Sequence, residues 1–144
     1  MKKVGFIGYG SMGRMLANGF LQSGRLTPGQ TLISNRTIVK TRGLARKWKG
    51  ITLTNSNRTV ARTADVLFIC VKPLEVLPVL QEIKPDLRVS TYLISIAGCV
   101  SLKDLESQFA GRISRVIPSL TSEVKEGISL VCHNSKVSTG ENLS

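Results

Sequence analysis

The sequence lacks the features that mark membrane, secreted and metal-binding proteins. No apolar run in its 144 residues approaches the roughly 18 that a membrane span needs. The basic start, Met1-Lys-Lys3, precedes a short, glycine-interrupted apolar stretch without a small-residue cleavage site, so we expect no signal peptide. Three widely spaced cysteines and one histidine, His133, form neither a disulfide framework nor a zinc site of about four ligands. These absences predict a cytoplasmic protein without a metal.

Acidic residues are missing from the first part of the chain. Residues 1–64 contain twelve Lys or Arg and no Asp or Glu, whereas residues 65–144 contain eight bases and nine acids. This asymmetry indicates an anionic partner, either a nucleic acid or a multiply phosphorylated small molecule. Aromatic residues are few and no nucleic-acid-binding motif is present, so the small molecule is favoured and nucleic acid is the weaker alternative.

Apolar and amphipathic segments alternate along the chain. This alternation predicts an α/β fold, a Rossmann-type doubly wound and mainly parallel sheet with helices on both faces. Strands are expected at residues 4–7, 31–33, 51–53, 66–71, 89–96, 113–117 and 128–132. Helices are expected at 11–23, 38–48, 73–83 and after a Ser101 cap, and a short helix or turn at 58–63. The helix over 38–48 should place Val39, Leu44, Ala45 and Trp48 on its apolar side, and Cys70 and Cys132 should be small core residues.

A glycine-rich turn joins the first expected strand to the first expected helix. The segment Gly8-Tyr9-Gly10-Ser11-Met12-Gly13 has the spacing G-x-G-x-x-G. In this position the first glycine permits a tight turn, the second lets a pyrophosphate approach the backbone, and the third allows close packing of helix and strand. The N-terminus of the helix then offers N–H groups and a partial positive charge to phosphates. The turn predicts a dinucleotide cofactor.

The end of the second expected strand indicates which dinucleotide. NAD enzymes place an Asp or Glu here to hold the ribose 2′-hydroxyl, but this chain reads Ser34-Asn35-Arg36-Thr37. A carboxylate would repel a 2′-phosphate, whereas an arginine and neighbouring hydrogen-bonding side chains would bind one. Lys40 and Arg42 add positive charge nearby. We therefore expect NADP(H) rather than NAD(H).

Four segments together resemble the pyrroline-5-carboxylate reductase family in order and spacing: Gly5 to Gly13, Ala64 to Pro73, Ile94 to Ala97 and Arg115 to Pro118. The resemblance covers about residues 3–132. It implies NADPH-dependent reduction of a cyclic imine, the last step of proline synthesis. It also implies that the backbone of Val71, Lys72 and Pro73 lies along the nicotinamide half of the cofactor and that Asn57 helps to hold the adenosine side.

One loop departs from the pattern of that family. The family usually has Met-Pro-Asn-Thr/Leu-Pro where this chain has Ile117-Pro118-Ser119-Leu120-Thr121. This loop and residues 34–37 are more similar to the late-competence (ComER-type) proteins of Bacillus-type bacteria, a subfamily linked to a competence locus. Ser119 and Thr121 are candidates for the substrate pocket. An alternative function is an NADP-binding regulatory protein that does not catalyse the reaction.

The length of the chain is the second departure. The family continues into more of the nucleotide domain and then into a helical domain that forms the dimer and completes the substrate pocket. We expect residues 1–133 to be an NADP-binding domain that is incomplete at its C-terminal side, with 134–144 a tail or a truncated continuation. The sequence offers no catalytic acid or base at a credible position. The chain alone is expected to be inactive, and the full-length protein is expected to be a homodimer or higher oligomer.

Overall fold

The computed structural model describes residues 2–117 and 130–137, which build one sheet between two layers of helices. Its strand order is β3-β2-β1-β4-β5-β6-β7. The strands are β1 (Val4–Ile7), β2 (Thr31–Ser34), β3 (Thr52–Thr54), β4 (Val66–Ile69), β5 (Tyr92–Ser95), β6 (Arg112–Ile117) and β7 (Leu130–His133). Neighbouring strands are parallel except for the antiparallel pair β6–β7. The expected doubly wound, mainly parallel fold is confirmed.

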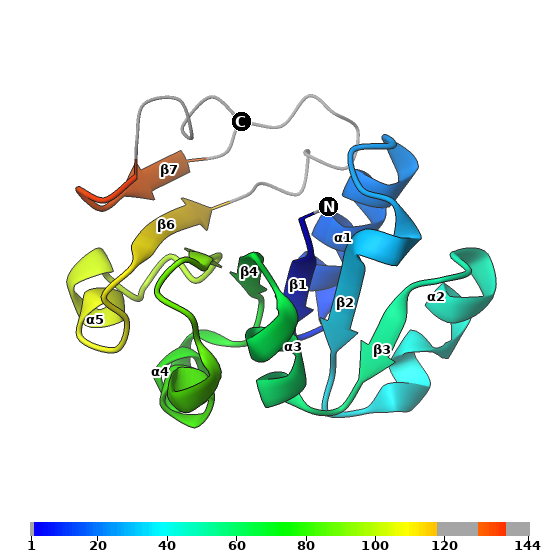
Figure 1. Cartoon of the computed structure of the whole chain (residues 1–144), viewed down its shortest axis with the longest axis horizontal. Coiled ribbons are helices and arrows are strands. Elements are labelled where there is room, and N and C mark those ends of the chain that lie inside the picture. The colour runs from blue at the N-terminus through cyan, green and yellow to red at the C-terminus, as the bar shows by residue number, and fades with distance from the viewer. Residues whose placement is uncertain (1, 118–129, 138–144) are drawn as a thin grey trace.

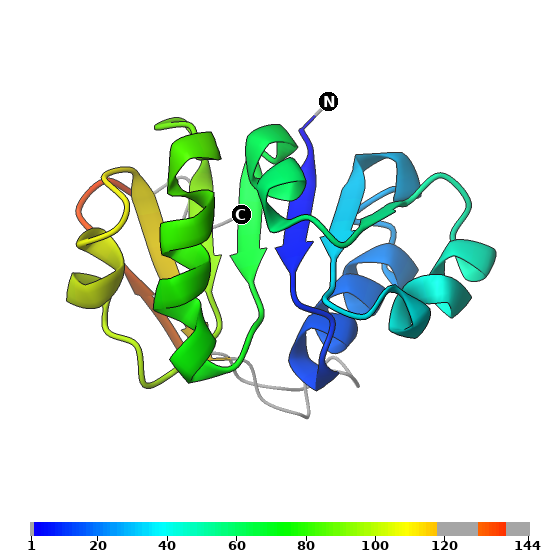
Figure 2. The ribbon, with the colours of Figure 1, turned by 90° about the horizontal axis from the view of Figure 1, so that it is seen from below.

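Helices cover both faces of the sheet. They are α1 (Ser11–Gln22), α2 (Arg42–Lys47), α3 (Asn57–Thr63), α4 (Pro73–Ile83) and α5 (Leu102–Glu106), with 3₁₀ turns η1 (Pro28–Gln30), η2 (Ile38–Thr41) and η3 (Lys84–Asp86). Figure 1 shows α3, α4 and α5 below the sheet and α1 above it. In Figure 2, which is seen from below, α3, α4 and α5 lie in front of the sheet. Among the described residues no helix is long and apolar enough to cross a membrane.

Two apolar cores form because alternate strand residues point to opposite faces. Ile7 and Leu67 pack with Val60 of α3 and Val76 of α4 in one core. Phe6 faces the other way and stacks on Phe68, with ring centroids 5.0 Å apart. The strands β1 and β4 are therefore buried on both sides, which accounts for their uninterrupted apolar sequence.

Several helix boundaries follow from side-chain caps. The Ser101 hydroxyl accepts a hydrogen bond from the N–H of Asp104, as expected, and Ser56 caps α3 through the N–H of Thr59. The α4 helix begins at Pro73, whose fixed φ suits the first helical position. These local signals place the carboxyl ends of β3 and β4 directly before helices.

Three core assignments were wrong. Cys132 is exposed because β7 lies at the edge of the described sheet and pairs on one side only. Val39 is 64% exposed and Ala45 is also exposed. Residues 38–41 form a 3₁₀ turn and the α-helix begins only at Arg42, so the expected helix over 38–48 is not continuous and its apolar residues do not share one buried side.

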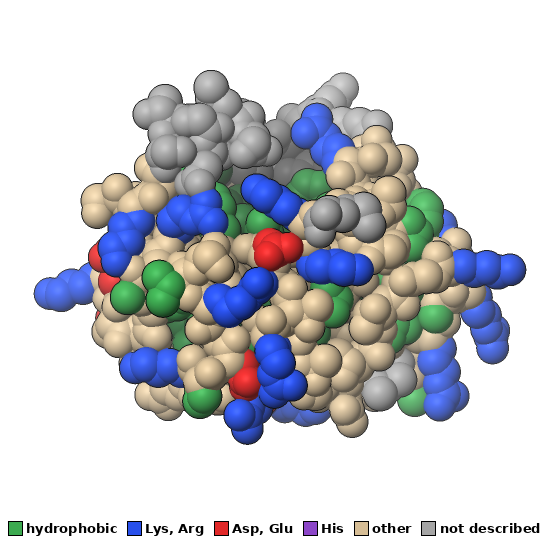
Figure 3. All heavy atoms as spheres, viewed as in Figure 1, with side chains coloured by type: hydrophobic (Ala, Val, Ile, Leu, Met, Phe, Trp, Pro, Cys, Tyr) green, Lys and Arg blue, Asp and Glu red, His purple; other side chains and the backbone are tan. Residues whose placement is uncertain are grey.

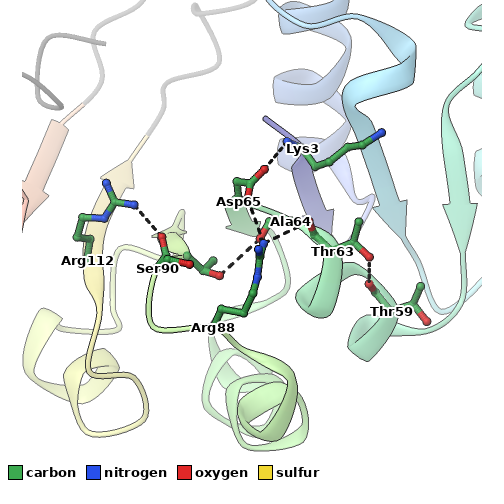
Figure 4. Close-up of polar contacts among 9 residues, drawn as sticks. Lys3, Thr59, Thr63, Ala64, Asp65, Arg88, Ser90 and Arg112 are labelled. Atoms are coloured by element: carbon green, nitrogen blue, oxygen red, sulfur yellow. Dashed lines mark hydrogen bonds and ion pairs between the residues drawn. The ribbon is translucent and has the colours of Figure 1, made fainter. Parts of the chain in front are cut away.

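The amino ends of the central strands are joined by a polar cluster, seen in Figure 4. The carboxylate of Asp65 accepts the backbone N–H of Lys3 at 2.8 Å and a guanidinium N–H of Arg88 at 3.1 Å. The same arginine donates to the carbonyl oxygen of Ala64 at 2.7 Å. The Lys3 hydrogen bond, aided by Arg88, lowers the pKa of Asp65 below its usual value. This cluster fixes β4 against β1 at the end opposite the cavity described next.

Candidate functional site

A cavity of about 590 Å³ lies at the carboxyl ends of β1, β2 and β4. The order of the strands reverses between β1 and β4, and ligands of doubly wound sheets bind at such a switch point. The residues that line the cavity come from the strand ends and one face of α4: Ile7, Gly8, Tyr9, Gly10, Ser34, Asn35, Arg36, Thr37, Asn55, Asn57, Cys70, Val71, Lys72, Glu75, Pro78, Val79 and Glu82.

The glycine turn has a different steric requirement at each glycine. Gly8 has a φ of +97°, a region that L side chains rarely adopt, and a Cβ there would lie 2.7 Å from the carbonyl oxygen of Cys70. A Cβ at Gly13 would lie 2.4 Å from the carbonyl oxygen of Gly8. A Cβ at Gly10 would meet nothing within 4 Å. The protein itself therefore needs glycine at 8 and 13, while the open space at Gly10 leaves the backbone accessible to a ligand.

The N-terminus of α1 is open toward this turn. Gly10 is its N-cap, no side chain caps it, and its first turn holds no acidic residue. The N–H of Arg14 makes the first helical bond to the carbonyl of Gly10 at 2.9 Å. The N–H groups of Ser11, Met12 and Gly13 precede that bond, so they have no partner within the helix. A helix end of this kind attracts an anion.

The loop after β2 is fixed to the glycine turn. The N–H of Gly8 donates to the carbonyl of Ser34 at 2.9 Å, and the N–H of Tyr9 donates to Asn35 Oδ1 at 3.1 Å. Asn35 Nδ2 in turn donates to the carbonyl of Thr37 at 2.9 Å. Asn35 therefore has a structural role that its residue type did not reveal: it joins the two loops that border the cavity.

Arg36 reaches across the cavity toward α4. Its Nη2 lies 3.4 Å from Glu75 Oε1, and the two side chains are 85% and 37% exposed. The sequence showed bases and no acid near this position, but the structure places the carboxylate of Glu75 opposite Arg36. An exposed ion pair of this length contributes little to stability and is readily broken.

Three hydrogen-bonded side chains, from the end of β2, the start of α3 and α4, form one side of the cavity. The hydroxyl of buried Ser34 donates to Asn57 Oδ1 at 2.5 Å, and Asn57 Nδ2 donates to Glu82 Oε2 at 3.3 Å. Ser34 ends β2, Asn57 begins α3 and Glu82 lies on α4. The chain thus orients the amide of Asn57 from both ends.

The end of β4 supplies the remaining wall. Burial raises the pKa of Cys70 to about 12, so its thiol stays protonated near neutral pH and is a packing group rather than a nucleophile. Val71 and exposed Lys72 follow it into the cavity. Among the described residues, no group of three or more potential metal ligands comes together.

Most of the predicted site residues share this cavity. Its lining includes ten of them, namely Gly8, Tyr9, Gly10, Ser34, Asn35, Arg36, Thr37, Asn57, Val71 and Lys72. Ser11, Met12, Gly13 and Pro73 lie beside it in the first turns of α1 and α4. Ser119 and Thr121 lie outside the described residues.

The residues that α4 contributes to the cavity were not predicted from the sequence. Glu75, Pro78, Val79 and Glu82 line the cavity at the spacing i, i+3, i+4 and i+7, which places residues on one face of a helix. That periodicity was readable in the sequence, but its mixture of acidic and apolar residues resembles an ordinary helix surface.

The bases on the face seen in Figure 3 are not gathered into one patch. In Figure 3 Lys and Arg side chains are scattered over the visible face with Asp and Glu side chains among them. Arg58 and Arg62, for example, both pair with Asp86. The cavity itself is lined by two bases, Arg36 and Lys72, and two acids, Glu75 and Glu82.

Comparisons with known proteins place this arrangement among oxidoreductases. Residues 3–98 match the family described as NADP oxidoreductase, coenzyme F420-dependent. ComE operon protein 4 of Bacillus subtilis is 39% identical over 129 residues, which are 90% of this chain and 47% of that protein. Pyrroline-5-carboxylate reductase 3 of the same organism is 34% identical over 135 residues, 93% of this chain and 49% of that protein.

Solved structures give the same picture. A pyrroline carboxylate reductase of Plasmodium falciparum with NADP bound matches with a TM-score of 0.83 and 29% identity, covering 99% of this chain and 52% of that one. A pyrroline-5-carboxylate reductase of Coxiella burnetii matches with a TM-score of 0.88 and 29% identity, covering 99% and 53%. The expected resemblance to these reductases and to ComER-type proteins is confirmed. The chain spans about half the length of the curated relatives it matches.

Proposed function

Because the chain belongs to the family described as NADP oxidoreductase, coenzyme F420-dependent, we propose that it binds NADP(H) in the cavity at the ends of β1, β2 and β4. The pyrophosphate would lie on Gly10 and the N–H groups of Ser11, Met12 and Gly13. Arg36, with Ser34, Asn35 and Thr37 beside it, would hold the 2′-phosphate. The observation that carries this proposal is the open space over Gly10 at an uncapped helix N-terminus, between two glycines that the fold itself requires.

The other lining residues would orient the two ends of the cofactor. The Ser34–Asn57–Glu82 chain presents a fixed amide on the side where the adenosine would lie. Val71 and Lys72, with Pro73 beginning α4, would border the nicotinamide half. Bound NADPH would supply a hydride to an electrophilic carbon. Burial raises the pKa of Cys70 to about 12, so we assign this thiol to the cavity wall rather than to nucleophilic catalysis.

We further propose that the reaction is reduction of a cyclic imine, as the names of the similar reductases indicate. The chain spans about half of those proteins, so turnover would need residues beyond the stretch that matches here. A second candidate, NADP(H) binding without turnover, is favoured by the 39% identity to ComE operon protein 4, whose name states no reaction. Measured on a protein that contains this chain and has the full length of the similar reductases, loss of NADPH absorbance with pyrroline-5-carboxylate as substrate distinguishes the two, since only the reductase consumes the cofactor.

Cofactor binding is tested by replacing Arg36. We expect fluorescence titration to give a much lower Kd for NADPH than for NADH, because only NADPH carries the 2′-phosphate that a guanidinium binds. Arg36→Asp should weaken NADPH binding by about tenfold or more, and NADH binding much less.

A matched control for charge is Arg25→Asp, at an exposed position outside the cavity lining. It should leave both dissociation constants nearly unchanged. Equal affinity of the unaltered chain for NADPH and NADH would contradict the role of Arg36. Absence of binding to both would contradict the proposed function itself.

A further inference from the structure

We propose that Glu75 is a specificity-determining residue, which holds Arg36 in the free protein and restrains the preference of the site for NADP(H) over NAD(H). This inference rests on the proposed function. The group that recognises the 2′-phosphate would then be opposed by an acid from a distant part of the chain. Residues 1–64 supply Arg36 without any acid nearby in sequence, and α4 brings one into the same cavity.

The geometry gives Glu75 access to the position of the phosphate. Arg36 follows β2 and Glu75 lies in the first turn of α4, 39 positions later in the chain, yet both line the cavity. Their side chains meet at 3.4 Å across it. A phosphate that binds Arg36 must therefore either displace Glu75 or lie beside its carboxylate.

Displacement is feasible because the pair is weak. The guanidinium of Arg36 is largely exposed and the separation is long, so the ion pair is screened by solvent. A phosphate carries about −1.5 to −2 charges and three acceptor oxygens, so it binds a guanidinium more strongly than one carboxylate does. After displacement, however, the carboxylate of Glu75 stays near the phosphate and repels it. The acid therefore weakens NADP(H) binding without preventing it.

NAD(H) does not meet the same repulsion. Its ribose ends in a 2′-hydroxyl, which can donate a hydrogen bond to a carboxylate. In NAD-dependent enzymes an acid at the end of the second strand accepts that bond, whereas here the acid that pairs with Arg36 comes from α4. Glu75 is thus unfavourable for one cofactor and neutral or favourable for the other, which is what defines a specificity-determining residue.

The test is Glu75→Gln, which removes the charge but keeps the size of the side chain. Titration of the unaltered and altered chains with NADPH and with NADH gives four dissociation constants. The Kd for NADPH should fall about fivefold, the size expected for removing one partly screened like charge, and the Kd for NADH should fall by less than about twofold or rise. Glu106→Gln, at an exposed position on α5 outside the cavity lining, is the control and should change neither.

The outcomes separate this inference from the proposed function. A preference for NADPH that is the same in the unaltered chain and in Glu75→Gln overturns the role of Glu75 and leaves the proposed function intact. An equal fall of both dissociation constants also overturns it, because that would indicate a general charge effect. If the unaltered chain binds neither cofactor, the proposed function fails and this inference fails with it.

Discussion

Replacement of Gly10 by alanine should separate the stability of the fold from binding of the cofactor. A methyl group at this position meets nothing within 4 Å, and the φ of −78° is ordinary for any residue. Glycine is better than alanine at an N-cap by up to about 1 kcal/mol. Alanine in turn lowers the entropy of the unfolded chain, which stabilises by about 0.4–1 kcal/mol. These effects nearly cancel, so the free energy of unfolding should change by less than about 0.5 kcal/mol.

Binding should respond very differently. The methyl group would project into the space that the proposed pyrophosphate needs, against the N–H groups of the first turn of α1. Loss of even one close backbone hydrogen bond to a charged phosphate corresponds to about 1.5–3 kcal/mol. The Kd for NADPH should therefore rise at least tenfold, and NADH binding should weaken equally because both cofactors carry the pyrophosphate.

Two glycines within α1, Gly13 and Gly19, serve as controls. Gly13→Ala would place a methyl group 2.4 Å from a backbone oxygen that no side-chain rotation can move, so we expect about 2 kcal/mol of destabilisation. Gly19→Ala, in the interior of α1 with nothing within 4 Å, should stabilise by about 1 kcal/mol and leave binding unchanged. Chemical denaturation and fluorescence titration of the three variants provide the measurements. Unchanged NADPH affinity in Gly10→Ala would contradict the proposed position of the pyrophosphate over Gly10.

Two further predictions concern groups away from the proposed phosphates. In the native protein at about pH 8, a thiol reagent should label exposed Cys99 and Cys132 quickly. It should label Cys70 only after unfolding, since burial raises the pKa of Cys70 to about 12. Rapid labelling of all three thiols in the native protein would contradict the buried position of Cys70. Asp65→Asn should lower the free energy of unfolding by about 1 kcal/mol near neutral pH. Folding lowers the pKa of Asp65, so the stabilisation by its carboxylate is present above the unfolded pKa of about 4 and is lost as pH falls through the folded pKa. In acid denaturation scans below the folded pKa, the unaltered chain and Asp65→Asn should therefore be equally stable.

The order of the elements was predictable because each has a strong local signal. The β1 and β4 segments are continuous apolar runs, since both of their faces are covered, and Ser101 and Pro73 mark helix starts by hydrogen bonding and by a fixed φ. Burial of side chains on the edge strands of the sheet was less predictable. Cys132 lies in an apolar run, but whether such a run is covered depends on elements that its own sequence does not specify.

The residues of the candidate site likewise fall into those that could be predicted from local sequence and those that could not. The glycine turn and the loop after β2, which both line the cavity, were predictable because the function proposed for them depends on the backbone and on short contiguous segments. Glu75 and Glu82 were not, because they reach the cavity only through the packing of α4 beside α3 and the strand ends. The local sequence of α4 specifies a helix, while the register of that helix against the sheet decides which of its residues face the cavity.

The two acids that α4 brings into the cavity change what the uneven distribution of charge along the chain implies. From the sequence, the excess of bases in residues 1–64 suggested a general attraction of anions to the N-terminal part. In the structure the acids of α4 offset the bases at the cavity itself, two against two. If the cavity binds a dinucleotide as proposed, its balanced charge would give little selection through the overall field, and we expect selection to depend on which group each phosphate touches. In the proposed complex the uncapped end of α1 would meet the pyrophosphate of either dinucleotide, so we expect Arg36 and Glu75, which pair at 3.4 Å, to be the positions that distinguish a 2′-phosphate from a hydroxyl.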